Sequence, residues 1–125
     1  MTILGIGIDT VEINRIKNIK NKIKFAKKIL CINEFNEFLT KKNKDHFLAK
    51  RFASKEAAYK ACSLKNIKKN IYLTDFEIFN NKNGKPNLIV LNETKIILKK
   101  IGVKYIHLSI TDQKYYASAI VIIEN

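Results

Sequence analysis

The stretch that decides the fold is Arg51–Ala61, which reads RFASKEAAYKA and lies at the centre of the chain. It belongs to a longer segment, His46 to Ser63, that is rich in Ala, Lys and Glu and contains neither Gly nor Pro. Such residues favour helix strongly, so the segment predicts a long helix. Glu56 and Lys60 are four residues apart, which places both on one face of that helix.

This Glu56–Lys60 pair has two interpretations. The simpler one is an ion pair on a solvated surface, because pairs at this spacing are common on exposed helices. Phe52, one turn earlier on the same side, instead favours a partly buried face. A partly buried carboxylate beside cations is a better ligand candidate than a solvated one.

Toward the N-terminus, residues 2–9 predict a buried strand that ends in an acid. One face carries Leu4, Ile6 and Ile8, and the other carries Ile3, Gly5, Gly7 and Asp9. The two glycines leave room for close approach by a ligand or by another backbone. Asp9 is either the first acid of a capping box with Glu12, opening the next helix, or a metal-binding carboxylate.

The rest of the chain predicts an α+β fold, with helices packed on a mainly antiparallel sheet in a single domain over residues 1–125. The expected helices run from about Val11, from Phe25 to Leu30, from Glu34 to Leu39, and from a cap at Asn92 to Ile101 before Gly102. The expected strands are Leu73 to Phe79, Asn87 to Leu91, Lys104 to Thr111, and Tyr115 to Ile123.

The strand after Lys104 is polar on one face. Tyr105, His107, Ser109 and Thr111 alternate with apolar residues, so they share the face opposite the core. This is either a solvated strand face or the lining of a ligand groove. His46, just before the long helix, fits a cap or surface position.

Charge and composition narrow the function classes. The net charge is +13, from 24 Lys and Arg against 11 Asp and Glu, which attracts polyanions such as nucleotides or an acidic protein. However, the 22 Lys, 21 Ile and 14 Asn all have A/T-rich codons, so genome composition accounts for part of this bias. Against that background, the two arginines, Arg15 and Arg51, point to a need for their fixed geometry.

We expect a cytoplasmic protein without a membrane span. No apolar run approaches the roughly 20 residues that cross a bilayer, and the N-terminus lacks the basic start of a signal peptide. Cys31 and Cys62 follow no metal or redox spacing, so both thiols are expected to stay reduced.

Three segments together resemble a known family. Gly5–Asp9, Arg51–Ala61 and His107–Thr111 occur in the order and rough spacing of holo-[acyl-carrier-protein] synthase, a 4′-phosphopantetheinyl transferase family. Asn83–Pro86 is similar to the family's turn between its middle strands. The resemblance covers nearly the whole chain.

The resemblance implies an enzyme of fatty acid biosynthesis. It would move 4′-phosphopantetheine from coenzyme A to a serine of apo-acyl carrier protein, releasing adenosine 3′,5′-bisphosphate. It also implies a homotrimer with active sites at subunit boundaries. The acidic carrier protein would dock on the basic helix after Val11, which carries Arg15.

Carried over residue by residue, the resemblance implies specific roles. Asp9 and Glu56 would bind Mg²⁺, and Glu56 is also our candidate for the catalytic base. Contacts with coenzyme A would come from Arg51 and Lys60 at its phosphates, and from Pro86, His107 and Ser109 around its nucleotide.

One departure and two other function classes stay open. The family usually has glycines just after the central helix, but Cys62–Asn66 has none, and Lys65, Lys68 or Lys69 would have to compensate. A small basic nucleic-acid-binding protein fits the charge but lacks a recognisable reader motif. A trimeric scaffold without activity fits the missing glycines.

Overall fold

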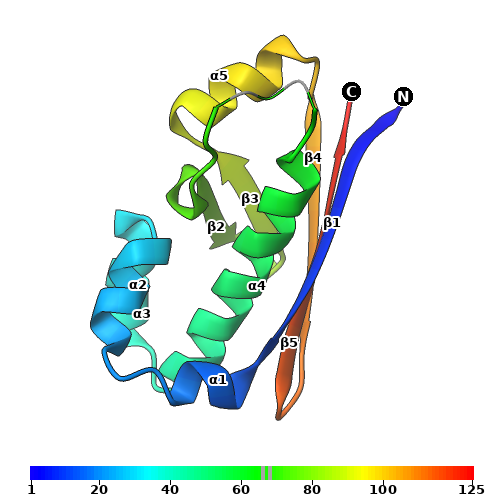
Figure 1. The fold of residues 1–125 in the computed structure, drawn as a ribbon. Helices are drawn as coiled ribbons and strands as arrows, with labels where there is room; N and C mark the ends of the chain where they lie inside the picture. Colours follow the sequence, from blue (N-terminus) through cyan, green and yellow to red (C-terminus); the bar gives the residue numbers. More distant parts are fainter. Residues whose placement is uncertain (66, 68) are drawn as a thin grey trace.

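The computed structural model describes residues 1–65, 67 and 69–125, and its elements surround one long helix, α4 (Lys44–Cys62). On one side of α4 lies a sheet of β1 (Ile3–Glu12), β5 (Tyr116–Glu124) and β4 (Tyr105–Asp112). On the other side lie α2 (Lys22–Ile29), α3 (Ile32–Thr40), the hairpin of β2 (Phe76–Asn80) and β3 (Pro86–Val90), and α5 (Asn92–Lys100) (Figure 1). The predicted α+β class is confirmed.

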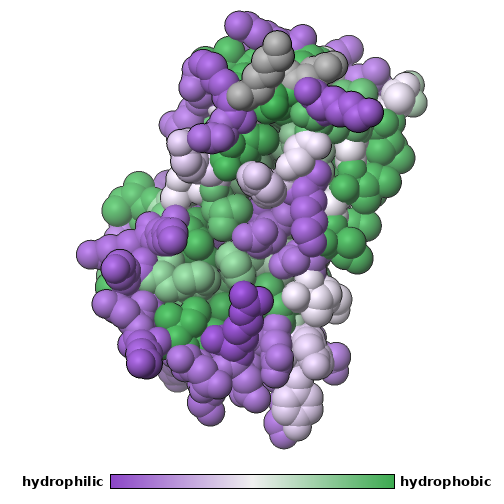
Figure 2. Space-filling model, in the orientation of Figure 1, coloured by the Kyte–Doolittle hydropathy of each residue, from purple (hydrophilic) through white to green (hydrophobic). Residues whose placement is uncertain are grey.

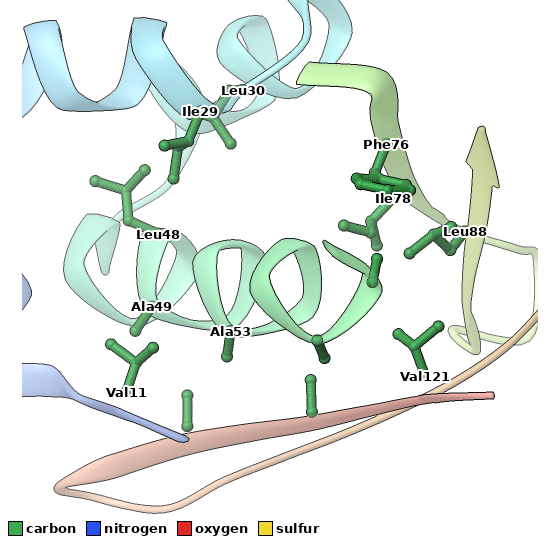
Figure 3. Packing of buried hydrophobic residues seen from close by; sticks show 14 of the residues in the cluster. Val11, Ile29, Leu30, Leu48, Ala49, Ala53, Phe76, Ile78, Leu88 and Val121 are labelled. Atoms are coloured by element: carbon green, nitrogen blue, oxygen red, sulfur yellow. The ribbon is translucent and has the colours of Figure 1, made fainter. Parts of the chain in front are cut away.

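The sheet has the order β1-β5-β4, with antiparallel neighbours throughout. Its inner face packs on α4 through small and branched side chains, of which Val11 and Val121 are shown with Ala49 and Ala53 of the helix (Figure 3). Ala49, Ala53, Ala57 and Ala61 recur every fourth residue and are fully buried. This alanine stripe lets the helix lie close to the strands.

The two glycines of β1 bring the strand backbone against α4. A Cβ atom on Gly5 would lie 2.0 Å from the carbonyl oxygen of Ala61, and one on Gly7 would lie 1.8 Å from that of Ala57. The four residues from Ala57 to Ala61 advance about 6 Å along the helix, and the two from Gly5 to Gly7 advance about 6.6 Å along the strand, so the two contacts repeat in step. The sequence left open whether a ligand or another backbone approaches these glycines, and the structure shows that the backbone of α4 does.

A buried ion pair fastens α4 to the opposite layer. Lys55 is 0% exposed, and its Nζ lies 2.5 Å from Glu34 Oε1 and 2.6 Å from the carbonyl oxygen of Phe76. Glu34 also accepts hydrogen bonds from the backbone N–H groups of Cys31 and Ile78, at 2.9 and 3.0 Å. Every charge in this pair therefore has partners, as a dry interior requires.

Two predictions near the N-terminus are wrong. The helix predicted from about Val11 begins at Ile13, as the short α1 (Ile13–Lys17), because Val11 and Glu12 still pair with β5. Asp9 therefore lies inside a strand and does not cap a helix. The apolar spacing that suggested one helix is divided between α1 and α2, and the Asn21 side chain caps α2 by accepting from the Lys24 N–H.

Two further boundaries differ. Leu73–Asp75 forms a 3₁₀ turn before β2, rather than the start of a strand. Asn92 does not cap α5 as predicted: Leu91 is the cap residue, while Asn92 has φ of 61° and donates its amide to Asp75. Gly102 ends α5 with φ of 94°, as expected, and the hairpin of β4 and β5 is confirmed. Among the described residues, no helix is long and apolar enough to cross a membrane.

Candidate active site

Asp9, Glu56 and Lys60 meet at the edge of the β1–α4 contact. Asp9 is on the inner face of β1, opposite Ala119 of β5, and α4 supplies the other two residues. Lys60 Nζ donates to Asp9 Oδ1 at 3.2 Å and to the carbonyl oxygen of Ile8 at 2.9 Å. Lys60 therefore forms its ion pair with Asp9 of the strand rather than with Glu56 as predicted, although its charge still acts on Glu56.

The electrostatics of this group are unbalanced. Burial raises the pKa of Glu56, and the negative charge of Asp9 raises it further, while Lys60 and Arg15 oppose the rise. The shift means that two carboxylates are close enough to repel each other. Such a pair has unused capacity for a cation.

The donor set fits Mg²⁺. Carboxylate oxygens are the ligands it prefers, and it usually takes one or two of them while substrate phosphates and water complete its shell. Among the described residues, no group of three or more His, Cys, Asp or Glu is arranged to hold a metal. Asp9 and Glu56 therefore suit an ion shared with a substrate better than one enclosed by protein alone.

A cavity of about 500 Å³ opens beside Glu56. Figure 2 shows hydrophobic surface on this face, between the helices α2 and α4 of Figure 1. The cavity is lined by Phe25, Lys28, Ile29, Phe52, Glu56, Tyr59, Ile71, Tyr72, Leu73 and Thr74. Glu56 is its one acidic lining residue, so the carboxylate stands at the border of an apolar hollow that can exclude water from a reacting group.

Arg51 lies elsewhere on α4. Five residues separate it from Glu56, about 140° around the helix. Its Nη2 donates to Glu37 Oε1 at 3.3 Å and its guanidinium lies 4.6 Å from the Phe47 ring centre. Burial lowers the pKa of Arg51, and Glu34 and Glu37 oppose this. Arg51 therefore does not reach the Asp9, Glu56 and Lys60 group of its own chain, and its predicted contact with coenzyme A phosphates stays a prediction.

Arg51 instead lines a separate small pocket of about 230 Å³. The lining includes Lys41, His46 and Lys50 together with the acid Glu37. Asn80, another lining residue, pairs with Pro86 at the start of β3. The predicted residues Arg51 and Pro86 therefore belong to one region of the molecule, away from Glu56.

His107 and Ser109 lie on the outer face of the sheet. They pair with Ile122 and Ile120, whereas Asp9 pairs with Ala119 on the inner face. Because alternate strand residues point to opposite sides, the sheet itself separates His107 and Ser109 from Asp9. One chain therefore brings Asp9, Glu56 and Lys60 together, but not the remaining predicted residues.

The same outer face is apolar. Ile6 and Ile8 are 57% and 62% exposed, and Ile120 and Ile122 of β5 lie beside them in register. Figure 2 shows hydrophobic surface along the edge where β1 runs in Figure 1. Contiguous exposed apolar side chains of this kind mark an interaction surface.

The segment after α4 is described in part. The predicted compensating residue Lys68 and the neighbouring Asn66 lie outside the described residues. Lys65 and Lys69 line a shallow pocket of about 290 Å³, and Lys69 forms an ion pair with Glu93.

Comparison with known proteins identifies the family. Residues 5–121 match the sequence profile of the 4′-phosphopantetheinyl transferase superfamily, and the chain belongs to that superfamily. Within it, the relatives are more specific. A holo-[acyl-carrier-protein] synthase of Buchnera aphidicola subsp. Acyrthosiphon pisum is 48% identical, with both chains covered completely.

Solved structures agree with this assignment. The holo-[acyl-carrier-protein] synthase of Neisseria meningitidis superimposes with a TM-score of 0.88 at 31% identity, covering 99% of this chain and all of the other. A holo-(acyl-carrier-protein) synthase of Bacillus anthracis in complex with CoA (3′,5′-ADP) gives 0.79 at 38% identity, covering 98% and 97%. The resemblance found in the sequence is confirmed.

Proposed function

We propose that this chain transfers 4′-phosphopantetheine from coenzyme A to a serine of apo-acyl carrier protein. The products are holo-acyl carrier protein and adenosine 3′,5′-bisphosphate, and the reaction serves fatty acid biosynthesis. The observation that carries the proposal is the Asp9–Glu56–Lys60 group beside a cavity. It occurs in a chain that matches holo-[acyl-carrier-protein] synthases along its whole length.

The reaction requires a proton acceptor and positive charge near the reacting phosphate. The serine oxygen forms a bond to the pantetheine-side phosphorus of the pyrophosphate, and the bond from that phosphorus to the oxygen of the departing nucleotide breaks. Glu56 accepts the serine proton, directly or through one water, a role favoured by its raised pKa. Lys60 offers an ammonium group to the phosphate oxygens on which negative charge gathers.

Asp9 and Glu56 are the residues that would hold Mg²⁺. When bound, the ion supplies positive charge that offsets the charge of the pyrophosphate. In this structure the ammonium group of Lys60 donates to Asp9 Oδ1 and supplies positive charge at that carboxylate. The direct check is calorimetric titration of the protein with Mg²⁺, where Asp9→Asn should remove the binding signal.

We further propose a homotrimer in which neighbouring chains complete each site. The exposed isoleucines of β1 on the outer face support association, because contiguous exposed apolar side chains mark interaction surfaces. The opposite placement of Asp9 and His107 supports a shared site, since a second copy can supply His107, Ser109, Arg51 and Pro86. Light scattering should give three times the 14.5 kDa chain mass.

Complementation tests the shared site directly. Glu56→Gln abolishes the chemistry at one wall and His107→Ala weakens nucleotide binding at the other, so trimers formed by unfolding and refolding the two variants together contain some intact sites. Transfer is measured at a coenzyme A concentration far below KM, and recovery means a rate above that of the His107→Ala protein alone. We expect recovered transfer in the mixture and none in a mixture of Asp9→Asn with Glu56→Gln, which disable the same wall. Equal activity in the two mixtures would contradict the proposal.

The partner is an acidic carrier protein docked near α1. Arg15 and Lys17 are exposed in the last turn of α1, and Arg15 is close enough to influence Glu56. Basic surfaces steer acidic partners by long-range attraction that salt screens. The transfer rate should therefore fall steeply as salt is added; a salt-independent rate would oppose this docking.

We also propose a cytoplasmic location, which the two unpaired cysteines Cys31 and Cys62 support.

One assay tests the activity itself. The protein is incubated with coenzyme A, Mg²⁺ and an apo-acyl carrier protein, and the carrier is examined by mass spectrometry. We expect the phosphopantetheine mass on a serine, and loss of transfer by at least about a hundredfold with Glu56→Gln. No transfer, with tight salt-sensitive binding to RNA, would favour a nucleic-acid-binding protein; no transfer and no such binding would favour a scaffold.

A further inference from the structure

His107 has a carboxylate partner that sequence reasoning did not single out. Its Nε2 lies 2.7 Å from Glu124 Oε1, across the outer face of the sheet. Glu124 stands opposite Tyr105 in the register, one diagonal step from His107, a position from which long side chains reach each other. The side chain of Glu124 is 16% exposed and that of His107 is 57% exposed. The acid is therefore the fixed member of the pair.

This contact selects one nitrogen of the imidazole. A carboxylate accepts but does not donate, so Nε2 must carry the proton it shares with Glu124. Nδ1 is then the ring nitrogen left for a ligand, and the ring plane is set by the bond on its other side. The residues nearest His107 on the same face are Tyr105, Ser109 and Ile122, none of which offers a carboxylate.

We propose that Glu124 is a positioning residue for coenzyme A binding. It holds His107 with Nε2 turned toward β5, so that Nδ1 meets the nucleotide of coenzyme A in the shared site. Glu124 itself touches neither the substrate nor the reacting phosphorus. The inference rests on the proposed function, because it takes His107 as part of the nucleotide site.

The test measures nucleotide binding apart from turnover. Adenosine 3′,5′-bisphosphate is titrated calorimetrically into the wild type, Glu124→Ala, His107→Ala and the double variant. We expect about tenfold weaker binding in each single variant, the value of one charge-assisted hydrogen bond. The double variant should be no weaker than His107→Ala, because the two side chains act as one unit.

Two further variants make the result specific. Glu124→Gln keeps an acceptor oxygen at the same reach, so it should recover part of the lost affinity. Glu12→Ala removes the same charge from an exposed position on β1, on the same outer face of the sheet as Glu124, and should bind as the wild type does. In transfer assays, Glu124→Ala should raise KM for coenzyme A about tenfold and change kcat little.

Several results would overturn the inference. Wild-type affinity in Glu124→Ala would do so, as would additive losses in the double variant or unchanged binding in His107→Ala. If Glu124→Ala no longer forms a trimer or no longer shows a thermal transition, Glu124→Gln is measured in its place. Wild-type affinity of Glu124→Gln for the nucleotide, together with an NMR signal showing His107 protonated at Nδ1, would then contradict the inference. These outcomes differ from failure of the proposed function, which is the absence of transfer by the wild type.

Discussion

Lys55 and Lys60 are five residues apart on one helix, and they do opposite things. Lys55 is fully buried and bonded to Glu34 and to the Phe76 carbonyl, so its charge is completely used. Lys60 is 52% exposed and faces Asp9 on the far side of the helix. The comparison shows that a charged residue of a sequence motif can act on a substrate only where the fold leaves its side chain exposed.

The acids beside the two lysines differ in the same way. Glu34 accepts from two backbone N–H groups and from Lys55, and Arg51 Nε lies 3.6 Å from its other oxygen, so its charge is matched by protein groups on every side. Asp9 and Glu56 repel each other and share Lys60. In the structural cluster the negative charge of the acid is matched by protein donors, whereas in the candidate binding cluster two carboxylates face one lysine and negative charge is left over.

The largest effect should come from Lys55→Met. It leaves Glu34 charged and buried with only the longer contact to Arg51, whose Nε lies 3.6 Å from Glu34 Oε2, so the change should cost about 3 kcal/mol of unfolding free energy. Urea denaturation followed by circular dichroism measures the loss. Glu34→Leu combined with Lys55→Met should recover much of it, because a buried ion pair replaced by apolar groups is often neutral. A change below about 1 kcal/mol in the single variant would refute the structural role of Lys55.

Lys60→Met makes the same substitution on the other face. Stability should change by less than about 1 kcal/mol, as for exposed ion pairs. Transfer should fall about tenfold to a hundredfold, because an ammonium group aimed at the phosphates is lost. Denaturation and initial-rate assays on one preparation separate the two quantities. Normal transfer together with reduced stability would mean that Lys60 has a structural role, as Lys55 does, and no role in the reaction.

A smaller effect concerns the pH dependence of stability. The folded-state pKa of Glu56 is raised above 4.5, so the folded chain holds this proton more tightly than the unfolded chain does. Its contribution to stability therefore falls as pH rises from about 4.5 through the folded pKa. Glu56→Gln removes the dependence, so the variant should be the more stable protein at pH 8 and have less advantage at pH 4.5. Thermal unfolding at both values, without metal, measures this; an equal difference at both would contradict it.

The smallest response should come from the thiols. Burial raises the pKa of Cys31 to about 11, against an opposing effect of Lys55, and raises that of Cys62 to about 12. Both stay protonated at pH 8 and are shielded from reagents, so an aromatic disulfide should modify neither until the chain opens. The absorbance of the released thiolate follows the reaction. Rapid modification of Cys31 would mean that the Lys55 cluster is accessible to water.

Local patterns were enough to predict much of the fold and the centre of the site. The long helix, the final hairpin and the shared helix face of Glu56 and Lys60 follow from spacings of two to four residues, which fix relative orientation without knowledge of the rest. The ion-pair partner of Lys60 is Asp9 of a distant strand, which no local spacing predicts. Asp9 was predicted as a ligand from its place at the end of a strand, although its strand is longer than expected.

Other features depend on long-range packing. Arg51 and Lys55 could not be assigned to the buried layer, because their partners Glu34 and Glu37 come from a different helix. The placement of His107 and Asp9 on opposite faces depends on how β4 and β1 each pair with β5. Glu124 could not be predicted from local sequence, because the contact that gives it a role is with His107, 17 residues away.

The backbone contact of Gly5 and Gly7 with α4 has a consequence for how this sequence can change. The chain as a whole is rich in Lys, Ile and Asn, which number 22, 21 and 14. At the two glycines, even a methyl group would overlap a helix carbonyl oxygen. The spacing between strand and helix, and with it the reach from Asp9 to Glu56, therefore requires glycine at both positions, whatever residues the composition favours elsewhere.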